Sequence, residues 1–168
     1  MKHLIIALTA VFFAGPFAAA QSGGVGFVDM DRAVQSIPQY EAMTEARERR
    51  VAAIEDTSSE LQDLLREQMT LFEQSKLTAS EASLEMQAAN IQKLQSELEG
   101  FRRDGQADVA MWTAEQEARL ASTVSDMVET LRAERGLIAV LDMEGAVAVD
   151  PSADLTDVVI ERLGGSLE

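Results

Sequence analysis

Four carboxylates form two short pairs at places where strands are expected to end. Asp29 and Asp31 are separated by one residue, and so are Asp142 and Glu144. Grouped carboxylate oxygens are the ligands that a hard cation such as Ca²⁺ or Mg²⁺ prefers. Acids that follow a strand are also common turn and capping residues, because their side chains accept hydrogen bonds from nearby backbone amides. We interpret both pairs as turn and capping residues and predict no metal site.

Histidine and cysteine, which serve most often in nucleophilic catalysis and zinc binding, are almost missing. The sequence has no cysteine and a single histidine, His3, which lies in a segment that we expect to be removed. A Ser-His or Cys-His nucleophile system and the usual zinc sites are therefore excluded from the mature chain. The sequence also contains no glycine-rich phosphate loop. We predict that the protein is not an enzyme and needs no cofactor.

The first 20 residues have the pattern of a secretory signal peptide. Lys2 and His3 form a short basic head, residues 4–13 are an apolar run, and Ala18–Ala20 supply small residues before a cleavage site. A membrane anchor is the alternative, but the apolar run is short for a span of about 20 residues. We expect cleavage after Ala20, a mature chain without another transmembrane segment, and a location outside the cytoplasm.

The mature chain is strongly acidic. The whole sequence has 14 Lys and Arg against 29 Asp and Glu, and only Lys2 lies in the signal peptide. The mature chain therefore holds 13 bases and 29 acids, a formal net charge of −16. Such a surface repels nucleic acids and anionic membranes, because both are densely negative themselves. We expect no nucleic-acid partner and no stable membrane insertion, whereas basic partners are compatible with this charge.

Residues 39–131 have the pattern of two long amphipathic helices folded back on each other. Apolar or small residues recur at steps of three and four, which place them on one stripe of a helix. In the first helix they are Ile54, Ser58, Leu61, Leu65, Met69 and Phe72, and in the second Leu84, Ala88, Ile91, Leu94, Leu98, Phe101, Val109, Trp112, Gln116, Leu120, Val124, Met127 and Leu131. Helices of roughly 35 to 50 residues extend about 50 to 75 Å. This pair must therefore protrude as an arm.

The stripe loses its phase between Ser75 and Glu81, where we expect the tip of the arm. Thr78 and Glu81 have the spacing of a capping box, which predicts that the second helix starts at Thr78. Further along, Gly100 and Gly105 each cost about 1 kcal/mol relative to alanine inside a helix. We interpret these glycines as points where the arm flexes, which argues against a rigid rod.

Both ends of the mature chain carry strand signals. Residues 23–30 are a β-rich run after glycines, and residues 137–142 and 146–149 have the pattern of a two-stranded hairpin. Short helices are expected at 31–36 and 155–163. The predicted fold class is α+β and mostly α, with a long antiparallel helical hairpin, or coiled-coil arm, inserted in a small β body.

Local signals set the borders of these elements. Pro38 suits the first turn of the arm, Gly136 ends its second helix, and Asp154 can cap the final helix. Three short strands make a sheet too small to stand alone, and open strand edges invite pairing with another chain. We infer an oligomer; a monomer whose sheet is covered by the final helix is the alternative. The predicted divisions are a signal peptide (1–20), an arm (39–131) and an oligomerisation body (21–38 and 132–168).

Short runs at both ends of the mature chain have a recognisable pattern. They are Gly26–Gln35 after the cleavage site, then Gly136–Asp142, Gly145–Val149 and Asp154–Thr156 near the C-terminus. In sequence and order these runs resemble the Skp/OmpH family of periplasmic chaperones for outer-membrane proteins. The order of signal peptide, strand, long helical hairpin, two strands and short helix is also similar to that family. The resemblance covers essentially the whole mature chain.

The resemblance implies a homotrimer shaped like a jellyfish, in which strands from three subunits form a shared β-barrel and three arms enclose a cavity. It implies an ATP-independent holdase that binds unfolded outer-membrane proteins in the periplasm of a Gram-negative bacterium. Carried over by position, the body and interface residues are Phe27, Val28, Ile138, Val140, Val147 and Val149. The client-binding residues near the arm tips are Met69, Leu71, Phe72, Leu77, Leu84 and Met86. Packing between the two helices is the role expected for Leu61, Leu65, Ile91 and Leu94.

The charge of the arm departs from this family. The well-known chaperones of the family have basic arms, whereas residues 60–99 here hold three bases and eight acids, a net charge of −5. A lipopolysaccharide contact, which the family implies, requires basic residues, so we do not expect it here. The alternative function is a structural coiled-coil adaptor of the cell envelope without chaperone activity.

Overall fold

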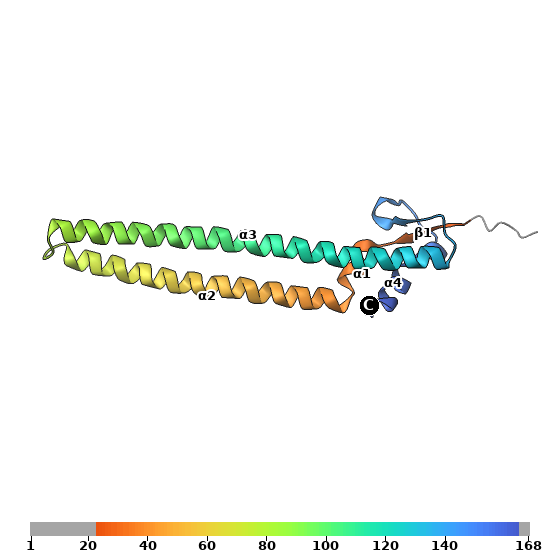
Figure 1. Ribbon diagram of the computed structural model, residues 1–168, viewed down its shortest axis with the longest axis horizontal. Helices are drawn as coiled ribbons and strands as arrows, with labels where there is room; N and C mark the ends of the chain where they lie inside the picture. Colours follow the sequence, from red (N-terminus) through yellow and green to blue (C-terminus); the bar gives the residue numbers. More distant parts are fainter. Residues whose placement is uncertain (1–22, 165–168) are drawn as a thin grey trace, which may run out of the picture.

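The computed structural model describes residues 23–164, and the predicted signal peptide lies outside this range. A small body at one end carries a long two-helix arm (Figure 1). In chain order the elements are β1 (Val25–Val28), α1 (Met30–Gln35), α2 (Pro38–Ser75), α3 (Glu81–Glu134), β2 (Ala139–Asp142), the 3-10 helices η1 (Met143–Gly145) and η2 (Pro151–Ala153), and α4 (Thr156–Arg162). The fold is α+β and mostly helical, as the sequence predicted.

The arm consists of α2 and α3, which lie side by side and run in opposite directions (Figure 1). They have 38 and 54 residues, which correspond to about 57 and 81 Å at 1.5 Å per residue. Because α3 is longer, its C-terminal part continues past the start of α2 into the body. No helix within residues 23–164 is long and apolar enough to cross a membrane.

The two ends of α3 follow local signals, one of which was misassigned. The helix begins after Ser80, whose Oγ accepts a hydrogen bond from the backbone N of Ser83 at 3.4 Å. Thr78 instead lies in the turn, where its backbone N donates to the carbonyl O of Ser75. The predicted cap was wrong because Ser80 offers an equivalent hydroxyl directly before the helical run. At the other end, Gly136 has a φ of 63°, a left-handed conformation that stops a helix and that glycine adopts without strain.

The body contains a parallel pair of strands in place of the predicted C-terminal hairpin. β1 pairs with β2, and Val25 lies opposite Ala139. Parallel strands need a long crossover connection, and here the whole arm provides it. The predicted strand at 146–149 is not formed: the chain turns into η1 directly after β2, where the Asp142 carboxylate accepts a hydrogen bond from the backbone N of Glu144. Among the described residues, the sheet therefore contains β1 and β2 alone.

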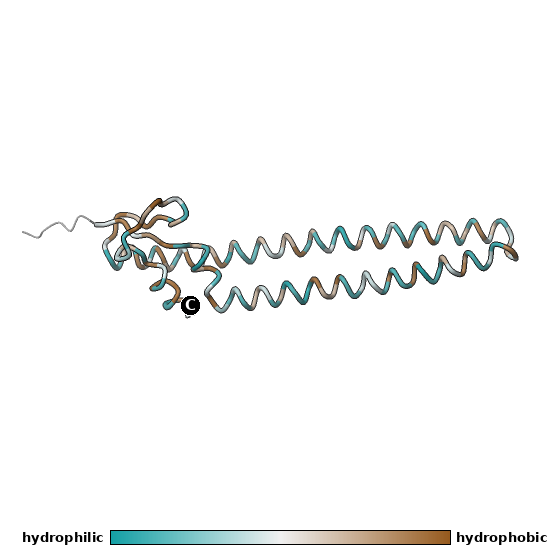
Figure 2. The backbone as a smooth tube through the Cα atoms, turned by 180° about the vertical axis from the view of Figure 1, so that it is seen from behind, coloured by the Kyte–Doolittle hydropathy of each residue, from teal (hydrophilic) through white to brown (hydrophobic). Residues whose placement is uncertain are grey.

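One buried apolar cluster joins the body to the base of the arm. Its members are Val28, Ala33, Ile37, Val124, Leu131, Leu155, Val159 and Ile160. They come from β1, α1, α3, α4 and the residues that precede α2 and α4, so that packing this cluster fixes the arm on the body. Figure 2 shows hydrophobic residues gathered in the body, while the arm alternates hydrophobic and hydrophilic positions. Each fully buried large aliphatic side chain contributes about 1.5–3 kcal/mol.

A buried threonine links the end of β1 to the start of α4. Thr156 is 0% exposed, and its Oγ1 accepts a hydrogen bond from the backbone N of Asp29 at 2.9 Å and donates to Asp154 Oδ1 at 2.6 Å. Asp154 Oδ1 also accepts from the backbone N of Thr156 at 2.9 Å, at the first residue of α4. Asp154 thus satisfies the first backbone N–H of α4, but the N-cap of this helix is Leu155, one residue later than predicted.

Candidate functional site

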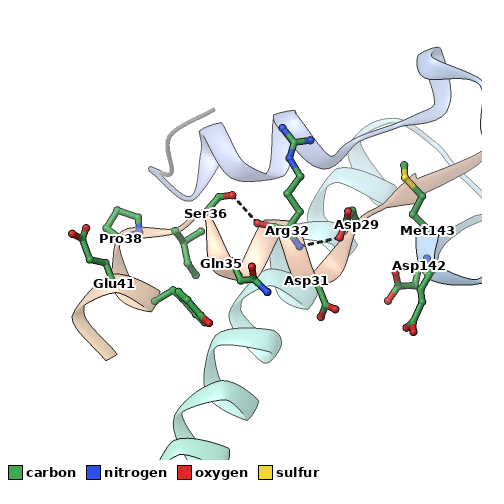
Figure 3. Close-up of a pocket in the computed structure, with 12 residues that line it drawn as sticks. Asp29, Asp31, Arg32, Gln35, Ser36, Pro38, Glu41, Asp142 and Met143 are labelled. Atoms are coloured by element: carbon green, nitrogen blue, oxygen red, sulfur yellow. Dashed lines mark hydrogen bonds between the residues drawn. The ribbon is translucent and has the colours of Figure 1, made fainter. Parts of the chain in front are cut away.

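The two acidic pairs meet in one cavity where the body joins the arm. Asp29, Asp31, Asp142 and Glu144 line a space of about 1030 Å³, together with Glu41 from the first turn of α2 (Figure 3). The pairs lie far apart in the sequence. They meet because β1 and β2 are parallel, so that the carboxyl ends of the two strands lie side by side.

Hydrogen bonds assign a capping role to one acid of each pair. Asp29 Oδ1 accepts from the backbone N of Arg32 at 2.9 Å and starts α1, and Asp142 Oδ1 accepts from the backbone N of Glu144 at 3.2 Å and starts η1. The Arg32 guanidinium points away from Asp31 and Asp142 (Figure 3) and pairs with Asp157 of α4 at 2.8 Å. Within residues 23–164, there is no group of three or more His, Cys, Asp or Glu side chains that could hold a metal ion.

Ion pairs fix the C-terminal end of α3. Arg162 of α4 contacts Glu134 of α3 at 2.7 Å between Nη2 and Oε2. The hydrogen bond from Arg162 lowers the pKa of Glu134 below its usual 4.5 and raises the pKa of Arg162. Within α3, the hydrogen bond from Arg132 lowers the pKa of Glu129 in the same way. Both acids face solvent, and the first pair connects two helices of the body.

The six predicted client-binding residues lie around the far end of the arm, and they differ in exposure. Four are exposed: Met69, Leu71, Leu77 and Met86. Two are half-buried: Phe72 and Leu84. Leu77, in the turn between α2 and α3, exposes 95% of its surface. Clustered exposed apolar side chains are a usual feature of interaction sites, so the arm end is a candidate contact surface.

The seam between α2 and α3 has a close approach in the middle of the arm. A Cβ atom added to Gly105 would lie 3.0 Å from Ile54 Cδ1, whereas one added to Gly100 would meet nothing within 4 Å. The structure therefore gives Gly105 a packing role that the sequence did not suggest. Nearby Ser58 is buried, and its hydroxyl has no hydrogen-bond partner among the described residues. Leu61, Leu65, Ile91 and Leu94 are all half-buried, in line with their expected packing.

The six predicted body residues also separate by exposure. Val28 is buried in the core, and Phe27, Val140 and Val149 are half-buried. Ile138 and Val147 are 71% and 105% exposed, so that two large aliphatic side chains of the body face solvent. The sequence did not distinguish these positions, because all six lie in similar β-rich runs.

Two further features of the arm were missed from the sequence. The Arg50 guanidinium lies over the Trp112 ring, 4.5 Å from its centroid, and links α2 to α3 near the base of the arm. Leu64 is 41% exposed on α2 although neighbouring leucines pack between the helices. Its offset from the apolar stripe was the signal that could have identified it.

Comparisons with known proteins match nearly all of the described chain. A family model described as outer membrane protein (OmpH-like) matches residues 24–163. Among solved structures, a crystal structure from Caulobacter crescentus, described as that of a "putative outer membrane chaperone (OmpH-like)", is similar over 91% of this chain and 90% of that chain. The TM-score is 0.75 and the sequence identity 21%, which supports a shared fold. A search of curated proteins found no significant match.

Proposed function

The chain belongs to the OmpH-like family of outer membrane proteins, and from this we propose that it is an ATP-independent holdase chaperone of the Gram-negative periplasm. Its clients are unfolded proteins, in particular precursors of outer-membrane β-barrels. The observation that carries the proposal is the long arm of α2 and α3, whose far end exposes Met69, Leu71, Leu77 and Met86. The proposed client-binding set also includes the half-buried Phe72 and Leu84.

The chemistry of the arm end suits the reversible holding of many sequences. Met69 and Met86 have flexible, polarizable side chains that adapt to partners of different shape. Promiscuous binding surfaces use such side chains because they can repack around each client. Leu77 in the turn adds an apolar contact at the extreme end of the arm. Several weak contacts of this kind hold an unfolded chain without selecting one folded shape.

The proposed assembly is a homotrimer in which strands of three bodies form a shared β-barrel and the arms enclose a cavity. A sheet of only two strands is marginal alone, and Leu141 of β2 is 50% exposed in the single chain. The exposed Ile138 and Val147 supply apolar surface that a neighbouring subunit would cover. In this proposal Phe27, Val28, Val140 and Val149 support the same interface, and residues 39–131 form the working arm.

The first experiment measures suppression of aggregation. An unfolded outer-membrane β-barrel is diluted from urea into buffer with residues 21–168, and light scattering and the mass of any soluble complex are followed at low and high salt. We expect less scattering and a complex that contains three copies of the chain. Stronger binding at high salt would indicate that apolar contacts act against charge repulsion.

Two sets of variants locate the contact. Replacing Met69, Leu77 and Met86 by serine should abolish suppression without loss of helix content, whereas Val51→Ser and Met111→Ser, nearer the body, should retain it. If the client aggregates as it does alone while the wild-type chain remains a trimer, the holdase proposal fails. The structural adaptor of the cell envelope then becomes the leading function.

A further inference from the structure

We infer that one outer face of α2 selects unfolded segments in which Lys or Arg recur at every third position among apolar residues. This inference rests on the holdase proposal and names the chemistry of its preferred clients. The face consists of Glu60, Leu64, Glu67 and Leu71, which we call the α2 stripe. Steps of four, three and four residues place all four side chains on one side of the helix. All four are exposed, with exposed fractions of 41% for Leu64 and 47% for Leu71.

The bases in this half of the arm are already neutralised. Residues 60–99 contain three of them, Arg66, Lys76 and Lys93. Each pairs with an acid on its own helix or in the adjoining turn: with Asp63 at 2.6 Å, Glu73 at 2.6 Å and Glu97 at 3.5 Å. The positive charge that could attract an acidic segment is thus used within the arm.

The remaining carboxylates of the same region have no cationic partner within residues 23–164. They are Glu60, Glu67, Glu81, Glu85 and Glu99. Only the first two lie on a helix face that also exposes leucines, because Leu64 and Leu71 alternate with them. The α2 stripe therefore combines apolar contact area with uncompensated negative charge.

The spacing of the stripe identifies the shape of its partner. Glu60 and Glu67 are seven residues apart, or about 10.5 Å along the helix axis. At that separation two carboxylates cannot hold one cation, so each contacts a separate positive group. In the polyproline II conformation, which unfolded chains commonly adopt, three residues span about 9 Å and return the side chain to the same face. A segment in this conformation with Lys or Arg at every third position therefore presents its charges to both carboxylates and places apolar side chains beside Leu64 and Leu71.

Charge complementarity selects this occupant over the others. An acidic segment would meet unpaired carboxylates, and nucleic acid or an anionic membrane would be repelled for the same reason. A neutral apolar segment would use the leucines alone and gain nothing from the acids. The preferred clients are consequently basic, apolar stretches of unfolded polypeptide.

The test uses residues 21–168 and two fluorescent unstructured peptides. Both carry leucine at the same positions, and one has lysine where the other has glutamate, at every third residue. We expect the basic peptide to bind about tenfold more tightly at low salt, with an advantage that shrinks as salt screens the charges. Equal affinity for the two peptides would overturn the inference.

Matched variants separate the stripe from the overall charge. Glu60→Gln with Glu67→Gln should weaken binding of the basic peptide about fivefold, since each exposed ion pair contributes little. Glu48→Gln with Glu55→Gln removes the same charge at the same spacing nearer the body and should change affinity less than twofold. Similar losses in both variants would show that only net charge acts. Leu64→Ala with Leu71→Ala should weaken the binding of both peptides. Unchanged affinity would also overturn the inference.

The outcome is distinguishable from failure of the holdase proposal. The Glu60→Gln, Glu67→Gln variant should still suppress aggregation of an unfolded β-barrel, because the apolar arm end is unchanged. If the wild-type chain suppresses aggregation but binds both peptides equally, the holdase proposal stands and the client preference falls. If the wild-type chain distinguishes the peptides but does not suppress aggregation, the α2 stripe is a basic-segment site without holdase activity.

Discussion

At the scale of single residues, polar groups in the body form hydrogen bonds with one another. The hydroxyl of Thr156 both accepts from the backbone N of Asp29 and donates to Asp154. It thereby joins the N-terminal strand to the C-terminal helix across 127 positions of sequence. A buried donor left without a partner loses its hydration and gains nothing in return. This side chain should consequently matter more than its small size suggests.

We expect Thr156→Val to lower the free energy of unfolding by about 1–3 kcal/mol. Valine keeps the shape of threonine but leaves the half-buried backbone N of Asp29 without this hydrogen-bond partner. Chemical denaturation followed by circular dichroism measures the loss. Thr123→Val is the control, because Thr123 is exposed and its hydroxyl donates only to the carbonyl O of Arg119 on the same helix. Equal effects of the two substitutions would contradict this account.

At the scale of the elements, the distance between α2 and α3 depends on Gly105. An added methyl group there would press on Ile54, whereas one at Gly100 would enter open space. From the sequence, both glycines were interpreted as points where the arm flexes. In the structure α3 continues through both, and only Gly105 is required for the approach of its neighbour.

We therefore expect alanine to change the free energy of unfolding differently at the two positions. Gly100→Ala should raise the free energy of unfolding by about 1 kcal/mol, since alanine favours a helix. Gly105→Ala should fall short of that gain by about 1–3 kcal/mol, the usual cost of overpacking. Urea denaturation of both variants provides the comparison. An equal gain at both positions would show that Ile54 moves aside freely and that the close approach does not limit stability.

The contact between α3 and α4 predicts a dependence on pH. Because Arg162 lowers the pKa of Glu134 in the folded chain, the ion pair stabilises the fold above the unfolded pKa of 4.5. This contribution is lost as the pH falls below 4.5 through the lowered folded value. Glu134→Gln should therefore reduce stability at pH 7 and reduce it less near pH 3. The measurement is urea denaturation at both pH values.

A control for this prediction removes the same charge elsewhere. Glu117→Gln changes an exposed carboxylate of α3 that lies in no ion pair among residues 23–164. It should shift stability by less than about 0.5 kcal/mol at pH 7. If Glu134→Gln and Glu117→Gln behave alike at both pH values, the contact with Arg162 does not stabilise the body.

At the scale of the whole molecule, the single chain exposes apolar surface at both ends. The arm end carries the candidate client contacts, and the body exposes Ile138 and Val147. These surfaces have different proposed partners, namely unfolded clients at one end and further copies of the chain at the other. A substitution at one end should therefore leave the activity of the other end measurable.

Ile138→Glu should convert the proposed trimer into monomers at micromolar concentration. A charge placed in an apolar subunit interface would be desolvated without a partner. Light scattering coupled to size-exclusion chromatography gives the mass of each species. Met111→Glu is the matched control, because Met111 on the arm has the same exposed fraction, 71%, as Ile138. A trimer that persists in Ile138→Glu would exclude this side chain from the interface.

Much of the arm was readable in the sequence because helices are specified locally. The apolar stripe, Pro38 at the start and Gly136 at the end predicted α2 and α3 to within a few residues. The misplaced cap at Thr78 is the kind of local ambiguity that arises when several hydroxyl residues stand near one helix start. The family resemblance was likewise readable, and the OmpH-like match over residues 24–163 confirms it.

The tertiary structure decided what depends on contacts between distant residues. Nothing local indicated that β2 would pair in parallel with β1 in place of the predicted hairpin, because strand pairing uses backbone groups that any sequence provides. The same non-local pairing brought Asp29 and Asp142 to one cavity. Residues of the opposing helix decided whether Gly105 packs closely. The ion pairs formed by nearby bases decided whether Glu67 has a cationic partner. The sequence by itself determined the helical arm, its acidity and the family. Contacts between residues determined which of the two glycines packs closely, which carboxylates have no cationic partner among the described residues and which leucines are exposed.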